Sequence, residues 1–275
     1  MHYSIKVSKK EGEKEVVKVV EVVFPYEKVV ESIKATETFE QVPQLELSQN
    51  KEAHQKFEEN VELKFYEKDC LEVAVNAKEK GLKPVVLVFG SEKFPLEGFK
   101  GNEGQEEDIY RRTSISLNLS PNNHLLFTQE KWSYQIKGGG GIHCKDVILF
   151  RGTSTTGYNY CPPRFLDFIV SASPPRSKLK DKEEKGRFFV EVKDEERYEN
   201  KLRSALSFAC KKGYDCFVLG AFGCGHSKVP ATQAVKVMVK LISTEFAHAF
   251  KEIRLAVIDD ANSALDHNKV SLTFS

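Results

Sequence analysis

The chain lacks any long apolar run. Hydrophobic residues make up 40% of its 275 residues, yet no segment approaches the roughly 18 consecutive apolar residues of a membrane span. Residues 1–18, MHYSIKVSKKEGEKEVVK, carry charges throughout and have no apolar core of an export signal. We therefore expect a soluble, unexported protein of the cytoplasm or nucleus, without membrane contact.

An excess of charge of either sign is also missing. Lysine and arginine number 41 and aspartate and glutamate 40, so the formal net charge is +1. A protein that binds nucleic acid through its phosphates usually shows a basic excess. We therefore expect no direct nucleic-acid binding, and we expect the chain to act as a monomer.

The cysteines form no CxxC pair. Six of them are scattered along the chain, four in apolar or strand-like surroundings that suit buried thiols. The seven histidines do not supply the spacing of a zinc site either. The pattern predicts a reducing compartment, no bound metal and no other cofactor. The cysteines are Cys70, Cys144, Cys161, Cys210, Cys216 and Cys224.

The length allows one large α/β domain preceded by an extension. Residues 1–60 combine the β-branched run VVKVVEVVF with EKVVESIKATETFEQV, whose apolar spacing predicts a helix that ends at Pro43. We expect this helical and extended segment to pack on a compact domain formed by residues 61–275.

Strands and helices alternate from Val61 onward. VELKFY predicts a half-buried strand, DCLEVAVNAKEKG a helix from near Asp69 to Gly81, and the continuous apolar run Pro84–Gly90 a strand covered on both faces. A helix is predicted from Glu106 to residue 119, and strands at 146–150 and 165–172. The βαβ alternation predicts an α/β fold with helices on both faces of a sheet.

Three further segments complete the pattern. Residues 120–141 are turn-rich and end in four glycines; no Lys-Ser/Thr pair follows them, so they predict a mobile hairpin or loop, not a phosphate loop. The charge run 176–187 predicts a solvated loop. Asp194 is expected to cap a helix that ends at Gly213, before a strand, a glycine turn, a helix and a final strand.

The stretch Phe94–Arg112, FPLEGFKGNEGQEEDIYRR, contains several glycines and then Gln105-Glu106-Glu107 at the start of a helix. Carboxylates at a helix N-terminus are favoured by its dipole. From these residues alone, a solvated first turn is the favoured interpretation.

A second glycine-rich turn, Gly220–Gly225, lies between a buried strand and a helix. Its backbone N–H groups could bind a phosphate or diphosphate, or the glycines could simply permit a tight turn. The two interpretations are equally supported by the local sequence. Cys224 and His226 flank a glycine, but no third group that would orient the histidine is identifiable, so a packing thiol is favoured over a nucleophile.

Taken together, the ordered segments LVFGSEKFPLEGFKGNEGQEEDIYRRTSI, DVILFRG, FLDFIVSASPP, LRSALSFACKKGYDCFVLGAFGCG and LAVID resemble the bacterial-type poly(ADP-ribose) glycohydrolases, a branch of the macrodomain superfamily. The resemblance covers roughly Val61 to the C-terminus. It implies a three-layer α/β/α sandwich with a mixed sheet, ADP-ribose or ADP-ribosylated protein as ligand, and hydrolysis of the glycosidic bond at the distal ribose.

The resemblance also implies the site residues. Glu107 would protonate the leaving atom and Glu106 would bind a ribose hydroxyl, so these two are the candidate catalytic residues. The candidate substrate-binding residues come from both glycine-rich segments. They are Glu97, Gly98, Gln105, Gly220, Ala221, Phe222, Gly223, Cys224, Gly225 and His226.

The chain departs from the family pattern at the distal ribose. Where the family typically has Asn-Pro-Gly-Gly-Gly, this chain has Phe94-Pro95-Leu96-Glu97-Gly98. The acid at Glu97 leads to the hypothesis of a cationic acceptor, such as an ADP-ribosylated arginine, beside polymer as substrate; a solvent-facing Glu97 is the alternative. Two other functions remain open: a catalytically weak ADP-ribose reader, and an enzyme that acts on another nucleotide such as an ADP-ribose phosphomonoester.

Overall fold

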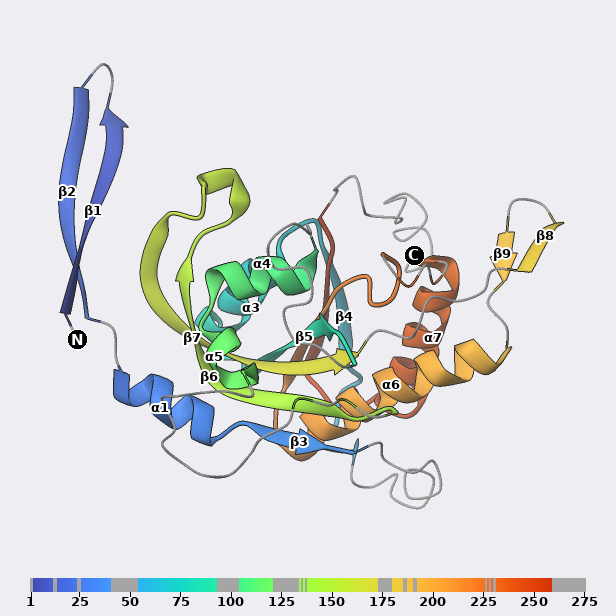
Figure 1. Ribbon diagram of the computed structural model, residues 1–275. Coiled ribbons are helices and arrows are strands. Elements are labelled where there is room, and N and C mark those ends of the chain that lie inside the picture. Colours follow the sequence, from blue (N-terminus) through green and yellow to red (C-terminus); the bar gives the residue numbers. More distant parts are fainter. Residues whose placement is uncertain are drawn as a thin grey trace.

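The computed structural model describes residues 2–11, 14–23, 26–40, 54–92, 104–120, 134, 136, 138–172, 180–184, 187–189, 192–225, 227, 229 and 231–258. Its centre is one seven-stranded sheet, in the order β3-β6-β7-β5-β10-β11-β4 (Figure 1). Strands β7, β5, β10, β11 and β4 are parallel, and β6 and β3 add two antiparallel pairings. The predicted mixed sheet is confirmed. The strands are β3 (Glu37–Phe39), β4 (Glu62–Tyr66), β5 (Pro84–Gly90), β6 (Gly141–Arg151), β7 (Tyr160–Ala172), β10 (Cys216–Leu219) and β11 (Glu252–Ala256).

Helices cover both faces of this sheet (Figure 1). On β5, Val85 and Leu87 belong to one apolar cluster and Val86 and Val88 to another, because successive side chains of a strand point to opposite faces. The first cluster includes residues of α6 (Val192–Lys211) and α7 (Ala231–Thr244); the second includes residues of α3 (Cys70–Glu79), α4 (Gln105–Arg112) and α5 (Ile115–Leu119). The predicted three-layer α/β/α sandwich is confirmed.

The ends of two helices show which local signals were reliable. Asp69 caps α3, since its carboxylate accepts hydrogen bonds from the backbone of Leu71 and Glu72 at 3.1 and 3.2 Å. Gly81 follows α3 with a φ of +82° and Gly213 follows α6 with +81°. The predicted start of α6 is wrong, because the helix begins at Val192 and Asp194 lies inside it.

The amino-terminal part differs from its prediction in one element. Strands β1 (His2–Glu11) and β2 (Lys14–Val23) form a two-stranded antiparallel sheet, and α1 (Tyr26–Lys34) packs Val29 and Ile33 against β6. The helix does not continue to Pro43. It ends at Lys34, and Glu37–Phe39 instead pairs with β6 as strand β3, because β-branched and aromatic residues such as those of this segment fit a sheet edge. The division at residue 60 stays a prediction.

The structure differs from the sequence prediction in three further segments. The single helix expected over 106–119 is divided into α4 and α5, because Thr113 is extended and forms a β-bridge with Leu149. Strand β8 (Lys180–Glu184) lies within the expected loop 176–187, and β9 (Arg187–Phe189) begins at its last residue. Strands β6 and β7 are longer than predicted and meet at a short 3-10 helix, Ser154–Thr156.

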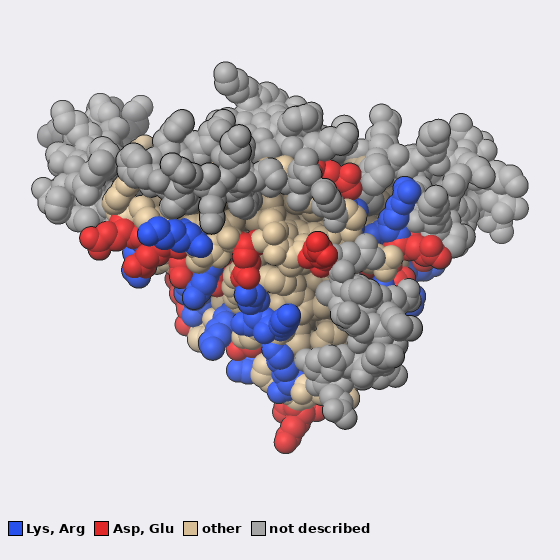
Figure 2. Space-filling view, turned by 60° about the horizontal axis from the view of Figure 1, so that its bottom comes forward, with Lys and Arg blue, Asp and Glu red and all other residues tan. Residues whose placement is uncertain are grey.

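The surface carries charges of both signs. On the face shown in Figure 2, acidic and basic side chains are interspersed around one group of lysine and arginine side chains. All six cysteines are free thiols. Of the helices in the described ranges, none is long and apolar enough to cross a membrane.

Candidate active site at the carboxyl edge of the sheet

The start of α4, at the end of the first glycine-rich segment, and the Gly220–Gly225 turn lie at one edge of the sheet. Strands β5 and β10 are parallel neighbours, so the chain that follows each of them starts at the same edge. Phe89, near the end of β5, joins the two. Its ring centroid lies 5.4 Å from that of Phe222, and a Cβ added to Gly220 would lie 3.2 Å from its Cζ.

Gln105 fastens the start of α4 to the end of β5. Its Oε1 accepts a hydrogen bond from Phe89 N at 3.0 Å, and its Nε2 donates to Leu87 O at 3.1 Å. These are the bonds that a neighbouring strand would make with β5. The side-chain amide of Gln105 therefore sets where the next two residues of α4 lie.

Glu106 lies between two buried tyrosines. The hydroxyl of Tyr110, one turn further along α4, donates to Glu106 Oε1 at 3.1 Å. Gly90 is also close by, since an added Cβ there would lie 3.6 Å from Glu106 Oε1 and 3.1 Å from the hydroxyl oxygen of Tyr134. The carboxylate of Glu106 is thus held at the very end of β5.

Glu107 takes a different direction. Its carboxylate folds back over Gly104, the N-cap residue of α4, so that a Cβ at Gly104 would clash with Glu107 Oε2. Adjacent helical residues point about 100° apart, since an α-helix has 3.6 residues per turn. The structure accordingly separates the two glutamates into two environments.

The third acid of this turn is neutralised by the protein. Arg112, whose side chain is 3% exposed, contacts Asp108 Oδ2 at 2.7 Å and Asp69 Oδ1 at 2.9 Å. Because Asp69 caps α3, this arginine joins the two helices that cover the same face of the sheet.

The Gly220–Gly225 turn is built from two overlapping backbone bonds. Phe222 N donates to Gly220 O at 2.8 Å and Cys224 N to Ala221 O at 3.0 Å, while Gly223 adopts a φ of +77° that favours glycine. Among the residues that the structure describes, the amides of Gly223 and Gly225 have no hydrogen-bond acceptor. Backbone amides of this kind can bind an anion.

The side chains of this turn point into the protein. Phe222 is fully buried, with its ring 5.6 Å from that of Tyr198, so it can meet a ligand through its backbone alone. Cys224 is 3% exposed, and burial raises the pKa of its thiol to about 12. A thiol held in its neutral form is a poor nucleophile, which disfavours the Cys224–His226 alternative.

A sequence model of one protein family covers the first of these two segments. The family described as microbial-type PARG, catalytic domain, matches residues 10–152, slightly more than half of the chain. The chain belongs to this family. It is therefore a catalytic domain of the poly(ADP-ribose) glycohydrolases, hydrolases that act on glycosyl bonds. The match starts upstream of Val61 and includes the start of α4, and it ends before Gly220.

Solved structures of this PARG family have the same fold. Poly(ADP-ribose) glycohydrolase from Deinococcus radiodurans, in complex with ADP-ribose, superposes with a TM-score of 0.69 at 19% identity, over 92% of this chain and 97% of that one. The enzyme from Thermomonospora curvata gives 0.70 at 22% identity, over 93% and 90%, and its complex with the inhibitor ADP-HPD gives 0.69 at 22%, over 94% and 91%. No curated protein sequence matches the chain significantly.

Three predicted site residues of this PARG-family chain, Glu97, Gly98 and His226, lie outside the described residues and stay predictions. The described part adds two that the sequence reasoning missed, Tyr110 and Tyr134. The spacing of Glu106 and Tyr110, four residues apart on one helix, is a signal that would have indicated the first. No local signal indicates Tyr134.

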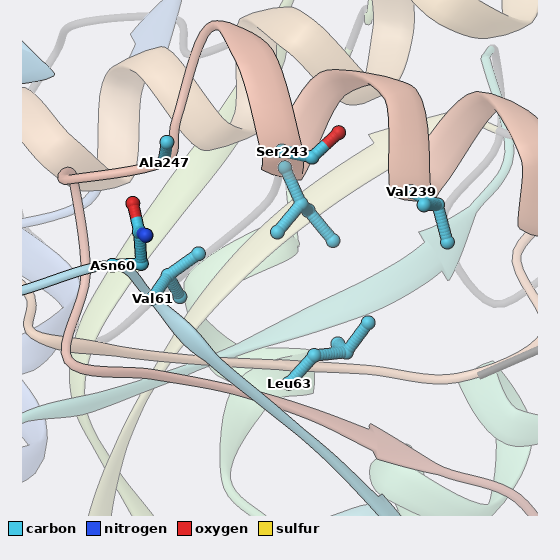
Figure 3. Close-up of a pocket in the computed structure, with 7 residues that line it drawn as sticks. Asn60, Val61, Leu63, Val239, Ser243 and Ala247 are labelled. Atoms are coloured by element: carbon cyan, nitrogen blue, oxygen red, sulfur yellow. The ribbon is translucent and has the colours of Figure 1, made fainter. Parts of the chain in front are cut away.

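A separate cavity lies away from this PARG-family site. It has a volume of about 280 Å³ and lies between β4 and α7, lined mainly by Val61, Leu63, Val239 and Ile242 (Figure 3). Its described lining residues include no predicted site residue and no charged side chain. Its apolar lining does not suit a diphosphate.

Proposed function

We propose that the chain binds ADP-ribose across the start of α4 and the Gly220–Gly225 turn and hydrolyses the glycosidic bond at its distal ribose. The substrate would be ADP-ribosylated protein or poly(ADP-ribose). One observation carries the proposal: the start of α4, with Glu106 and Glu107, and the turn lie at the same edge of the sheet, and Phe89 contacts Gln105 of the first and Phe222 of the second.

The turn supplies the diphosphate site in this proposal. The amides of Gly223 and Gly225 would donate to the phosphate oxygens, and α7 begins at Ala231, soon after the turn. Within the described part of the chain, no residue has an atom within 4 Å of a Cβ added to Gly225. A residue without a Cβ lets a phosphate approach the backbone closely.

The two glutamates would have different roles in the reaction. Cleavage of a ribosyl bond passes through an oxocarbenium-like transition state, which requires protonation of the leaving atom and correct placement of the sugar. Glu107 would act as the general acid. Glu106, held at the end of β5 by Tyr110, would bind a hydroxyl of the distal ribose.

Binding and turnover should be measured side by side on the wild type and on Glu107→Gln. The binding of ADP-ribose is followed by calorimetry. Turnover is the release of ADP-ribose from polymer and from defined arginine-, serine- and glutamate-linked substrates. We expect both proteins to bind ADP-ribose, and Glu107→Gln to lose at least about 100-fold in turnover, the scale of general acid catalysis.

Three outcomes would contradict parts of the proposal. Wild-type binding without any turnover would make the chain a reader of ADP-ribose. Absence of both, with turnover of an ADP-ribose phosphomonoester, would indicate a different enzyme. Equal rates on all linkages, or activity on polymer alone, would remove the hypothesis that Glu97 favours arginine-linked substrates.

A further inference from the structure

Tyr110 contacts the reaction machinery without being part of the QEE motif. It lies four residues after Glu106 on α4, and its hydroxyl donates to Glu106 Oε1 at 3.1 Å. Its side chain is buried within the apolar cluster between the helices α3, α4 and α5 and the sheet. A ring fixed by such packing holds its hydroxyl in one place, whereas a glutamate side chain is intrinsically rotamer-rich.

Groups of β5 and of residue 134 also lie near the carboxylate of Glu106. Tyr134 donates its hydroxyl to Ser91 O at 2.8 Å, and this hydroxyl lies near the position that a Cβ of Gly90 would take. A Cβ at Gly90 would also lie 2.6 Å from Val170 Cγ1. Only glycine at this position lets β5 end so close to Glu106 and the two tyrosines.

The hydroxyl of Tyr110 remains a donor over the working pH range. Burial, and then the charge of Glu106, raise the pKa of Tyr110 far above its usual value; Tyr134 and Cys144 are the other titratable groups that act on it. Burial and the same glutamate also raise the pKa of Tyr134. Both phenols therefore stay neutral beside the carboxylate.

We propose that Tyr110 is a positioning residue: it holds the carboxylate of Glu106 in the orientation in which that carboxylate binds the distal ribose. This inference rests on the proposed function of Glu106. Tyr110 itself touches no substrate in this arrangement, and its effect passes through Glu106 alone.

The test is a double-mutant cycle of Tyr110→Phe and Glu106→Ala. Phenylalanine keeps the ring in the apolar cluster and removes only the donated bond, and alanine removes the acceptor. We expect Tyr110→Phe to lower kcat/KM for ADP-ribose release and the affinity for ADP-ribose by about tenfold, the scale of a hydrogen bond to a charged group. In the Glu106→Ala background the same change should have no further effect.

Tyr214→Phe is the matched control. It also deletes one buried tyrosine hydroxyl, which donates to Asp167 Oδ2 at 2.8 Å and lies outside the site. We expect it to alter the unfolding midpoint but not kcat/KM. Unchanged activity of Tyr110→Phe, or an equal loss with and without Glu106, would overturn the inference. A wild type that neither binds ADP-ribose nor releases it would instead contradict the proposed function.

Discussion

The missing side chain of Gly104 decides where the carboxylate of Glu107 lies. The glycine is the N-cap of α4, and its φ of −127° and ψ of 170° are extended values that any residue adopts. The backbone therefore does not need a glycine here. What needs it is Glu107, whose Oε2 occupies the space of a Cβ.

We expect Gly104→Ala to reduce turnover by at least about tenfold, because the displaced carboxylate leaves the geometry that catalysis requires. The free energy of unfolding should fall by about 1 kcal/mol or less, since alanine is only a somewhat poorer N-cap. Activity assays and urea unfolding check the two values. In a Glu107→Gln background the substitution should cause no additional loss, and unchanged turnover in the wild-type background would contradict the argument.

At this scale the candidate acids came from the family resemblance, because the local residues alone favoured a solvated first turn. The catalytic roles of Glu106 and Glu107 stay predictions. Gln105 was predicted to bind substrate, and its amide instead bonds the backbone of Leu87 and Phe89; a substrate contact for it stays a prediction. Tyr134 could not be predicted, because its position depends on chain segments that are remote from it in sequence.

Helix α4, which carries the candidate catalytic residues, is held to α3 by one buried cation. Arg112 contacts Asp108 on its own helix and Asp69 at the start of α3. Removal of one partner from a buried ion pair leaves charge without compensation in a poorly solvated site. Arg112 should therefore stabilise the packing of α3 and α4 on this face of the sheet.

We expect Arg112→Met to lower the free energy of unfolding by about 3 kcal/mol, the lower end of the range for breaking a buried pair. Arg164→Met is the matched control, because Arg164 contacts Glu79 at a similar distance, 2.8 Å, with both side chains about half exposed. That control should cost no more than about 1 kcal/mol. Equal losses for the two variants in urea unfolding would show that burial does not set the contribution of Arg112.

The sequence predicted those elements whose signals are local. The buried strand β5 was identified from its uninterrupted apolar run. Helix α3 was identified from Asp69 at its start and Gly81 after its end. These signals can be recognised in the local sequence without knowledge of a tertiary partner. The break at Thr113 and the strand β3 were missed. Both depend on pairing with strand β6, and the local pattern of neither segment records that partner.

At the scale of the whole molecule, a partly buried polar chain links several strands of the sheet. His143 Nδ1 lies 3.0 Å from Glu37 Oε1, and its Nε2 lies 2.7 Å from the hydroxyl of Tyr214, which donates to Asp167. Asp167 pairs with the first half of β5, and Tyr214 precedes β10. This network joins β3, β6 and β7 and includes neither candidate glutamate, so a substitution in it can change the stability of the fold without removing a candidate site residue.

The overall topology could be predicted only by resemblance. Alternation of strands and helices indicates a sheet with two covered faces, but it does not state that β6 runs antiparallel between β3 and β7. Such register information lies in contacts between residues about a hundred positions apart, for example Glu37 and His143. Periodicity within one segment cannot contain it.

The polar chain makes stability depend on pH in a defined direction. Burial lowers the pKa of His143, partly opposed by its bond to Glu37 and by Asp167, with Lys212 acting in the same sense as burial. Burial also lowers the pKa of His54. Because the unfolded histidines take up protons near pH 6.5 and the folded ones only below that, the folded state should be fully stable above pH 6.5 and lose stability as the pH falls below it.

We expect urea unfolding between pH 7.5 and 5 to show this decline, by at most about 1.4 kcal/mol per pH unit for each of the two histidines. His143→Gln should reduce the slope, because of these two histidines only His54 then contributes in this window. Glu37 cannot account for the effect: burial alone would raise the pKa of Glu37, but its bonds to Lys212 and His143 lower it, so its contribution is lost only at more acidic pH. A stability that rises from pH 6.5 to 5, or a slope that His143→Gln leaves unchanged, would show that the histidine does not stay neutral in the folded chain.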